Sequence, residues 1–188
     1  KFFKSDLRGK CDSLQTNQKT GITKMFKHPV IWSGENQITG DSIHLTSNVK
    51  TNKLDSLFIK KNAFIIQKDS IGYSQIKGIN MYGKFVDNQL CSLLAKGNGE
   101  VINYARDEEK KLIAILNMIC SNILFNLENN SIQTIQFLMK PEGKTYPPSK
   151  YPKEKKFLKG FVWREKEKPL TKEDIYINEP VILTNQYL

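Results

Sequence analysis

The side chains best suited to acid–base or metal chemistry in this sequence are two histidines and a few acidic pairs. His28 precedes a proline and is expected in a turn. His44 lies between two aliphatic residues, so a strand would place it on the opposite face, toward solvent. Neither histidine has a cysteine or carboxylate at ligand spacing, and Glu108 and Glu109 lie in a charged segment typical of a solvated tip. These residues predict neither a catalytic site nor a metal site.

Other motifs that bind phosphate or activate a nucleophile are missing from the sequence. The segment Gly97-Asn98-Gly99 is not followed by Gly-Lys-Ser or Gly-Lys-Thr, and a strand is expected where a phosphate loop needs a helix. The three cysteines form no Cys-x-x-Cys pair, and we expect small apolar fillers, with a single disulfide left open. We therefore expect a protein that is not an enzyme and that needs no cofactor.

The charge balance favours anionic partners. The 188-residue chain has a formal net charge of +10 at pH 7 and an apolar fraction of 39%, which suffices for one domain with a real core. Nucleic acid, membrane head groups and phosphorylated glycolipid are all candidate partners, although a Lys-, Asn- and Ile-rich composition can also reflect genome base content. Tyr73, Tyr82 and Tyr104 are scattered and predict no platform for stacked bases, so nucleic acid is not expected.

The most regular feature is a repeat that must organise the fold. The template Asn-x-[Leu/Ile]-x-x-[Leu/Ile]-x-apolar occurs at residues 52–59, 88–95 and 130–137. A second repeated ending, a turn residue followed by an apolar strand, occurs at residues 28–32, 62–66 and 98–102. Such recurrence is typical of an array of similar units, here strand–turn–strand units that begin with an incomplete repeat at residues 1–33. The fold class is therefore all-β, with repeated β-hairpins that close as two facing sheets or as a solenoid.

Period-two patterning within these hairpins predicts one apolar stripe. In residues 79–85, for example, alternate positions are apolar or glycine, which places them on one face of a strand. Residues 112–120 are apolar on both parities, so a buried helical turn is an alternative there. The predicted inward stripe consists of Ile43, Leu45, Leu57, Ile59, Ile79, Met81, Phe85, Leu93, Ile123, Phe125, Ile135 and Phe137.

The character of the chain changes at residue 141. Residues 1–140 are predicted to form the repetitive β domain, and residues 141–188 a Pro- and Lys-rich cap or extension with a short helix near residues 153–158. Phe157, Phe161, Val162 and Trp163 are its expected anchors, and residues 181–183 could add a strand. From the residues alone, the stripe of the β domain fits a closed core or an open groove that takes acyl chains, and the closed core is favoured.

The ordered repeats also resemble a known family. The carriers of the resemblance are Ile38-Thr39-Gly40-Asp41-Ser42-Ile43, the two halves of the unit at residues 52–66, Gln75-Ile76-Lys77-Gly78-Ile79-Asn80-Met81, the opening residues 2–14 and the closing segment Leu158-Lys159-Gly160-Phe161-Val162-Trp163-Arg164. Together these segments are similar to the OstA-like proteins of Bacteroidetes, within the wider LptA/OstA family of lipopolysaccharide transport.

The resemblance implies a fold, a location and partners. It implies a two-sheet, V-shaped β-jellyroll, a periplasmic location, and lipid A of lipopolysaccharide held in the trough along the apolar stripe. The Pro-rich tail of loops and short helix after residue 141 departs from the short classical bridge protein and could cap one end. It also implies end-to-end association with other jellyroll-fold transport proteins, possibly with copies of itself. The chain starts at Lys1 in mid-repeat, and we expect a processed product whose signal peptide was removed, or a fragment that does not include it.

Overall fold

The computed structural model is all-β, as the sequence predicts, and describes residues 1–3, 7–128 and 131–177. Within those residues the helical elements are four single turns of 3-10 helix. None of these helices is long or apolar enough to cross a membrane. The elements are β1 (Phe2–Phe3), β2 (Arg8–Lys10), β3 (Ser13–Asn17), β4 (Ile22–Phe26), β5 (Val30–Ser33), β6 (Asn36–Thr39), β7 (Ser42–Ser47), β8 (Leu54–Lys68), β9 (Tyr73–Val86), β10 (Gln89–Arg106), β11 (Leu112–Glu128), β12 (Ser131–Leu138), β13 (Glu142–Tyr146), η1 (Pro148–Lys150), η2 (Lys153–Lys155), η3 (Glu165–Glu167) and η4 (Glu173–Ile175).

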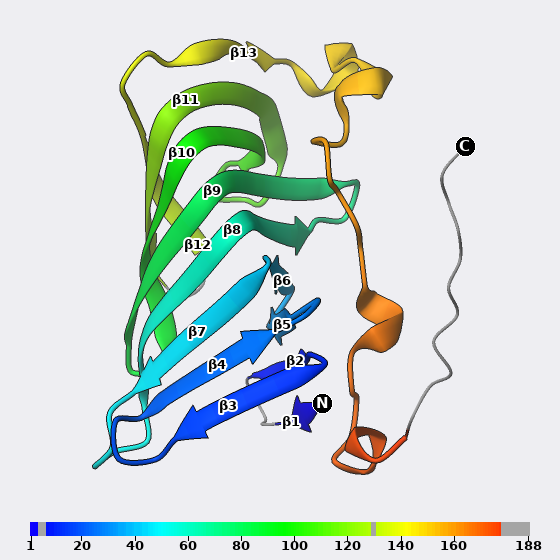
Figure 1. Cartoon of the computed structure of the whole chain (residues 1–188). Coiled ribbons are helices and arrows are strands. Elements are labelled where there is room, and N and C mark those ends of the chain that lie inside the picture. The colour runs from blue at the N-terminus through cyan, green and yellow to red at the C-terminus, as the bar shows by residue number, and fades with distance from the viewer. Residues whose placement is uncertain (4–6, 129–130, 178–188) are drawn as a thin grey trace.

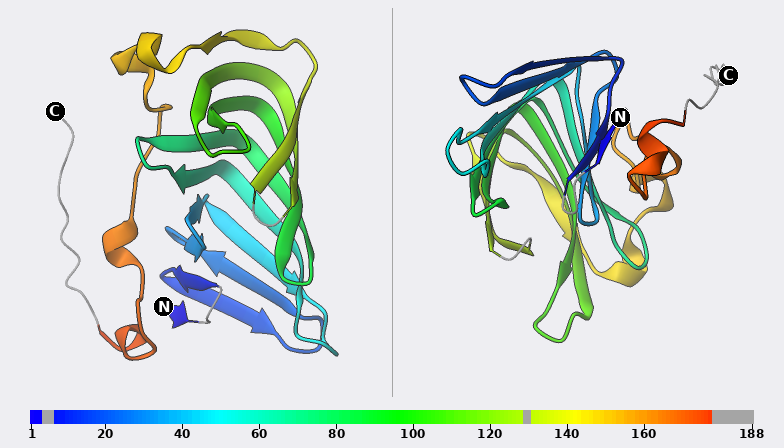
Figure 2. Two further views of the ribbon diagram at one scale, coloured as in Figure 1. Left: turned by 180° about the vertical axis from the view of Figure 1, so that it is seen from behind. Right: turned by 90° about the horizontal axis from the view of Figure 1, so that it is seen from below.

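All strands pair antiparallel, and the long strands β8 to β11 bend so that each contributes to two walls (Figure 1). Wall 1 consists of β3, β4, β7, residues 54–60, 80–86, 89–96 and 122–128 of the long strands, and β12. Wall 2 consists of β1, β2, β5, β6, residues 63–68, 73–78, 99–106 and 112–120, and β13. The right view of Figure 2 shows the strands diverging from the bends as two walls, which is the expected two-sheet jellyroll. The helical alternative for residues 112–120 is wrong, because these residues belong to β11.

The bends depend on residue pairs in the left-handed conformation. Two consecutive residues with φ between 48° and 80° lie at each bend of every second strand: Lys27-His28, Lys61-Asn62, Gly97-Asn98 and Met139-Lys140. Asparagine and glycine tolerate this region best, which explains the turn residue that opens each apolar ending in the second sequence repeat. The register shifts at residues 60–63 and 96–99 mark the same bends in β8 and β10.

The first sequence repeat also has a physical cause. In each of its three copies one residue lies opposite no partner, namely Asp55, Cys91 and Gln133, so the ladder has a β-bulge between the two aliphatic positions. The extra residue of the bulge increases the spacing between successive inward side chains from two residues to three. This is the Leu-x-x-Leu spacing of the repeat. The copies also contact each other at the hairpin tips, where the Leu54 amide donates to the Asn88 side chain at 2.7 Å. The turn predicted at Asn129-Asn130 lies outside the described residues.

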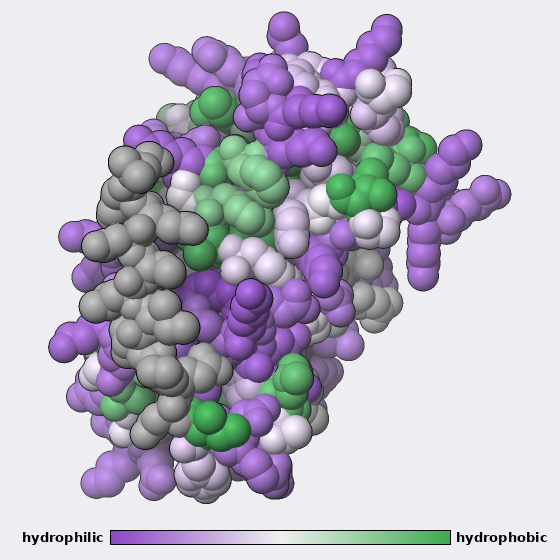
Figure 3. All heavy atoms as spheres, turned by 90° about the vertical axis from the view of Figure 1, so that its right-hand side faces the viewer, coloured by the Kyte–Doolittle hydropathy of each residue, from purple (hydrophilic) through white to green (hydrophobic). Residues whose placement is uncertain are grey.

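The tail begins as a strand of the sheet and continues as a strap. β13 pairs with β11, so residues 142–146 extend wall 2. The strap, residues 147–177, then runs across the strands of wall 2 from β11 toward β2, on the face away from wall 1 (Figure 1). The predicted short helix is the 3-10 turn η2, while the strand predicted at residues 181–183 lies outside the described residues. Figure 3 faces the strap and shows a largely hydrophilic surface with limited hydrophobic patches.

Two buried glutamines hold the strap. Gln37 donates to the Val162 carbonyl at 2.7 Å and accepts from the Arg164 amide at 2.6 Å. Gln75 repeats the arrangement with the Lys156 carbonyl and the Leu158 amide, at 2.7 and 2.8 Å. Each side-chain amide thus makes the two hydrogen bonds that a neighbouring strand would make with the extended backbone of the strap. Neither glutamine has exposed surface.

The predicted anchors of the strap divide into two pairs. Phe161 and Trp163 pack against Tyr73, with ring centroids 5.2 Å apart in each case. The Phe157 and Val162 side chains remain more than half exposed, although the Phe157 ring approaches that of Phe161 at 4.5 Å. Val162 is therefore fixed through its carbonyl and not through its side chain.

Ion pairs of Glu167 fix the later part of the strap to β2. The Glu167 carboxylate accepts from Arg164 at 2.6 and 2.8 Å and from Lys10 of β2 at 2.7 Å. The Arg164 guanidinium, then Lys10, lowers the Glu167 pKa to about 2 despite the opposing effect of burial. This carboxylate therefore holds the strap to β2 only while it is ionised.

Candidate functional site: an apolar trough between two walls

Wall 1 presents the predicted stripe to the interior as aligned rungs. One rung pairs Met25, Ile43, Ile59, Met81, Ala95, Ile123 and Phe137 across the strands. The next pairs Thr23, Leu45, Leu57, Gly83, Leu93, Phe125 and Ile135, and Phe85 pairs with Leu90 in a third. All the predicted stripe residues except Ile79 belong to one core cluster, in which Ile135 and Phe137 are partly buried.

Ile79 is a correction to that stripe. Its side chain is 48% exposed, it is not part of the core cluster, and it packs where a Cβ on Gly97 would lie. The cause is the bend in β9, where the inner face passes from Ile76 to Met81, an odd step of five positions. An odd step reverses the parity of the alternation, so extrapolating from Met81 back across the bend fails.

Wall 2 supplies an inner rung that the pattern did not predict as a site. Ile31, Ile38, Ile65, Ile76, Val101 and Met118 are paired across it in direct register. Their opposite-face neighbours Trp32, Gln37, Ile66, Gln75 and Ile102 are also buried. Burial on both faces removes the alternation, so these strands read as apolar runs such as Phe64-Ile65-Ile66. The signal was present as the second repeated ending of the sequence.

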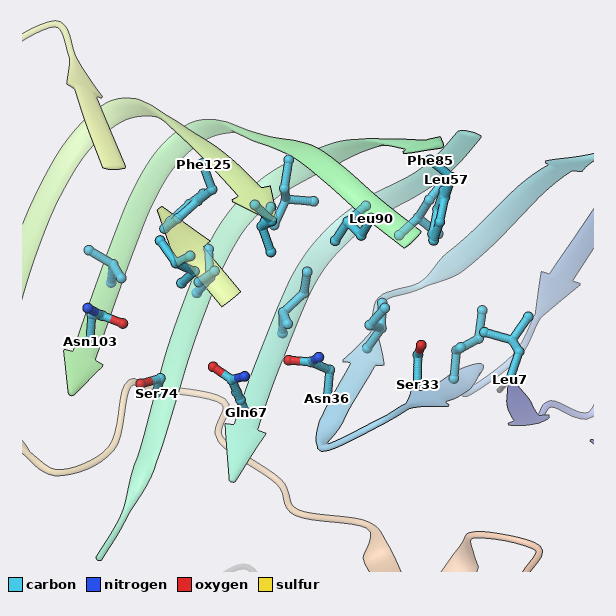
Figure 4. A pocket seen from close by; sticks show the side chains of 18 of the residues that line it. Leu7, Ser33, Asn36, Leu57, Gln67, Ser74, Phe85, Leu90, Asn103 and Phe125 are labelled. Carbon is cyan, nitrogen blue, oxygen red and sulfur yellow. The ribbon is translucent and has the colours of Figure 1, made fainter. Parts of the chain in front are cut away.

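The two walls enclose a pocket (Figure 4). Its volume is about 850 Å³ with the open mouth included, and the enclosed cavity itself is about 60 Å³. Five predicted stripe residues line it, Leu45, Leu57, Phe85, Leu93 and Phe125, while Ile43, Ile59, Met81 and Ile123 lie fully buried beneath. None of the residues that line the pocket is charged. The remaining lining is Leu7, Ile31, Ser33, Asn36, Ile38, Ile65, Gln67, Ser74, Ile76, Leu90, Val101, Ile102, Asn103, Leu127 and Ile132.

The titratable candidates do not meet at this pocket. His44 lies on the outer face of wall 1, as predicted, where it is partly and not fully exposed. Its ring packs edge-on against Phe26 and Phe58, and its Nε2 is buried with no hydrogen-bond partner in the residues that the structure describes. Burial, followed by the charges of Lys24 and Lys60, lowers the His44 pKa. The His28 Nδ1 lies 3.4 Å from the Asp12 carboxylate. In the described part of the chain no cluster of His, Cys, Asp and Glu could hold a metal ion.

The cysteines are free thiols. Cys120 is buried, whereas Cys11 and Cys91 are partly buried. Burial raises the pKa of both the Cys11 and the Cys120 thiols, which favours the protonated, unreactive form. The expectation of small apolar fillers fits Cys120 and Cys11, which belongs to the residues packed against the core.

With this geometry in view, the chain was compared with known proteins. A solved structure described as LptH, the LptA homologous periplasmic component of the conserved lipopolysaccharide transport device from Pseudomonas aeruginosa, matches with a TM-score of 0.55 and 15% sequence identity. The match covers 75% of this chain and 95% of that one. The chain has the LptH fold.

The expected LptA-like β-jellyroll is thereby confirmed. No family model matches the sequence, and no curated protein sequence matches it. At 15% identity the likeness to LptH establishes the fold, and nothing in it supports an origin in Bacteroidetes.

Proposed function

We propose that this protein binds lipopolysaccharide without enzymatic action and carries it in the periplasm. The observation that supports this most is the pocket between two apolar walls whose lining holds no charged side chain. Such a surface suits acyl chains, since each buried methylene contributes about 0.8 kcal/mol. In this proposal the lipid A chains lie along the rungs of wall 1 and wall 2.

The partners follow from the same fold. LptH is a component of a transport device in the periplasm, which supports the same compartment here. Both walls end in edge strands, β3 and β1 on one side and β12 and β13 on the other. An edge strand can be extended by another sheet, so we propose end-to-end contacts with other jellyroll proteins or with copies of this chain as part of a bridge to the outer membrane.

A second candidate function is a scaffold with a closed core. The small enclosed cavity, about 60 Å³, favours it, because pockets that bury a drug-sized ligand have volumes of roughly 300–1,000 Å³. The two candidates therefore differ in whether the space between the walls is used.

Photo-crosslinking at two aromatic positions of β9 separates these candidates. Phe85 lines the pocket, whereas Tyr82 lies on the outer face and is 43% exposed. A photoreactive azidophenylalanine at either position changes the side chain little. Incubation with lipopolysaccharide is expected to give adducts at position 85 and few at position 82. Adducts at position 82 alone would indicate binding to the outer surface, and no adduct at position 85 would favour the closed scaffold.

A further inference from the structure

A row of uncharged polar side chains lines the pocket on wall 2. Ser33 pairs with Asn36, Asn36 with Gln67, and Gln67 with Ser74 in direct cross-strand register. Asn103 continues the row, because the adjacent pairs Ile102–Gln75 and Val101–Ile76 fix its register opposite Ser74. Figure 4 shows these five side chains in one line, facing the side of the pocket where Phe125, Leu90 and Phe85 lie. We name these five residues the polar row.

The amides of the polar row have no hydrogen-bond partner among the described residues. In the described residues, no hydrogen bond involves the side chains of Asn36, Gln67 or Asn103, whereas the Ser74 hydroxyl accepts from the Tyr104 amide at 3.1 Å. All three amides are partly exposed, so water can reach them. Gln37 and Gln75, the chain neighbours of Asn36 and Ser74, point the other way, and each donates one hydrogen bond to the strap and accepts one from it. Side-chain amides on the outer face of wall 2 thus have hydrogen-bond partners in the strap, whereas those on the pocket face can bind a ligand.

A ligand that covers the polar row must replace that water. An amide covered by a hydrocarbon chain alone would lose its hydrogen bonds, which costs about 1–3 kcal/mol for each group. A lipid whose neutral polar groups lie at this level would replace those bonds. No charged side chain lines the pocket, so the row suits amides, esters and hydroxyls better than phosphates. With strands about 4.8 Å apart, five strands give a row about 19 Å wide.

We propose that the polar row binds the amide, ester and hydroxyl groups where acyl chains join a sugar headgroup. The row then sets the depth of the lipid, with the chains against the aliphatic rungs and the sugar at the mouth. The next inward rung, Ile31, Ile38, Ile65, Ile76 and Val101, meets only hydrocarbon. This assignment rests on the proposed lipid-carrying function and adds to it the part of the lipid that wall 2 recognises.

The test compares two probes on variants of the whole chain. One probe is an uncharged glucosamine with one amide-linked and one ester-linked acyl chain; the other is N-phenyl-1-naphthylamine, an apolar fluorescent probe without such linkages. Asn36→Leu and Gln67→Leu remove the polar groups and retain bulk beside Leu7, which lines the same pocket. We expect each variant to weaken binding of the acylated glucosamine roughly 10-fold, as the loss of about one hydrogen bond predicts, and to leave the apolar probe within about 2-fold.

A matched control and the melting temperature make the outcomes decisive. Gln136→Leu makes the same type of exchange at an exposed position on wall 1, and should change neither affinity. Equal losses for both probes, or no loss for the acylated glucosamine in variants with unchanged melting temperature, would overturn the assignment of the polar row. Wild-type protein that binds neither probe would instead overturn the lipid-carrying function, and the polar row with it.

Discussion

The two walls of the trough use their faces differently. Wall 1 buries its inner face and leaves its outer face to solvent, where Tyr82 is 43% exposed. Wall 2 is covered on both faces, by wall 1 inside and by the strap outside, and carries buried glutamines on one face and free amides on the other. Wall 1 thus acts as a plain apolar surface. Wall 2 combines a fixed, covered back with a hydrogen-bonding front.

The largest expected effect tests whether wall 1 stabilises the fold through its inner face. Phe125 is fully buried, so Phe125→Ala should lower the free energy of unfolding by about 3–5 kcal/mol. Leu94 follows Leu93, the cross-strand partner of Phe125, and pairs with Leu124 on the outer face. It is only partly buried, so Leu94→Ala should cost clearly less. Urea denaturation followed by circular dichroism measures both. Equal losses would contradict the one-sided burial of wall 1.

The next effect concerns the covered back of wall 2. Gln37→Ala combined with Gln75→Ala removes four hydrogen bonds to the strap backbone, which should destabilise the protein by about 2–4 kcal/mol. Trp32 pairs with Gln37 in the same buried row, and its emission should shift to the red as the strap detaches. Gln136→Ala is the exposed control. An unchanged emission maximum and unchanged hydrogen exchange in residues 156–164 would show that the glutamines do not hold the strap.

A pH dependence should come from the end of the strap. The folded pKa of Glu167, about 2, lies below its ordinary value of 4.5, so its contribution to stability is complete above about pH 5 and disappears as pH falls toward 2. The size is on the order of 1–3 kcal/mol, since the group is partly solvated. Glu167→Gln should therefore flatten the stability profile between pH 5 and 2. A profile identical to that of the wild type would exclude this carboxylate as the source.

The smallest effect concerns the bends that separate the walls. Asn62 has a φ of 48°, where a β-branched side chain is strained, so Asn62→Val should cost about 1–2 kcal/mol. Asn62→Gly should retain most of the stability. Ser56→Val, at a regular outer position of the same strand, is the control. Thermal melts of the three variants check the order, and a stable Asn62→Val protein would show that the bend does not need this conformation.

The contrast between the walls also explains what the sequence could reveal. Wall 1 alternates, so its stripe, such as Leu57 and Ile59, was predictable from period two. Wall 2 does not alternate, because Ile65 and Ile66 are buried on opposite faces. The polar row was not predictable from residue type, since Gln67 and Gln75 have the same side chain although Gln67 lines the pocket and Gln75 faces the strap.

The bends were the other limit of sequence reasoning. A strand steps six positions across a bend where it has a left-handed pair, as β8 does from Ile59 to Ile65, and five where it has none, as β9 does from Ile76 to Met81. No single residue type encodes this difference. Ile79 was misplaced for this reason. The two sequence repeats were visible in the sequence. The bulges and bends to which they correspond are visible only in the structure.

In the proposed function, lipid acyl chains lie between the two walls. Intermolecular nuclear Overhauser effects between acyl-chain protons and labelled isoleucine δ1 methyls test it without any substitution. We expect contacts from bound lipopolysaccharide to Ile65 and Ile76, which line the pocket, and none to Ile79, which lies outside it. Contacts at Ile79 with none at Ile65 and Ile76 would contradict the account.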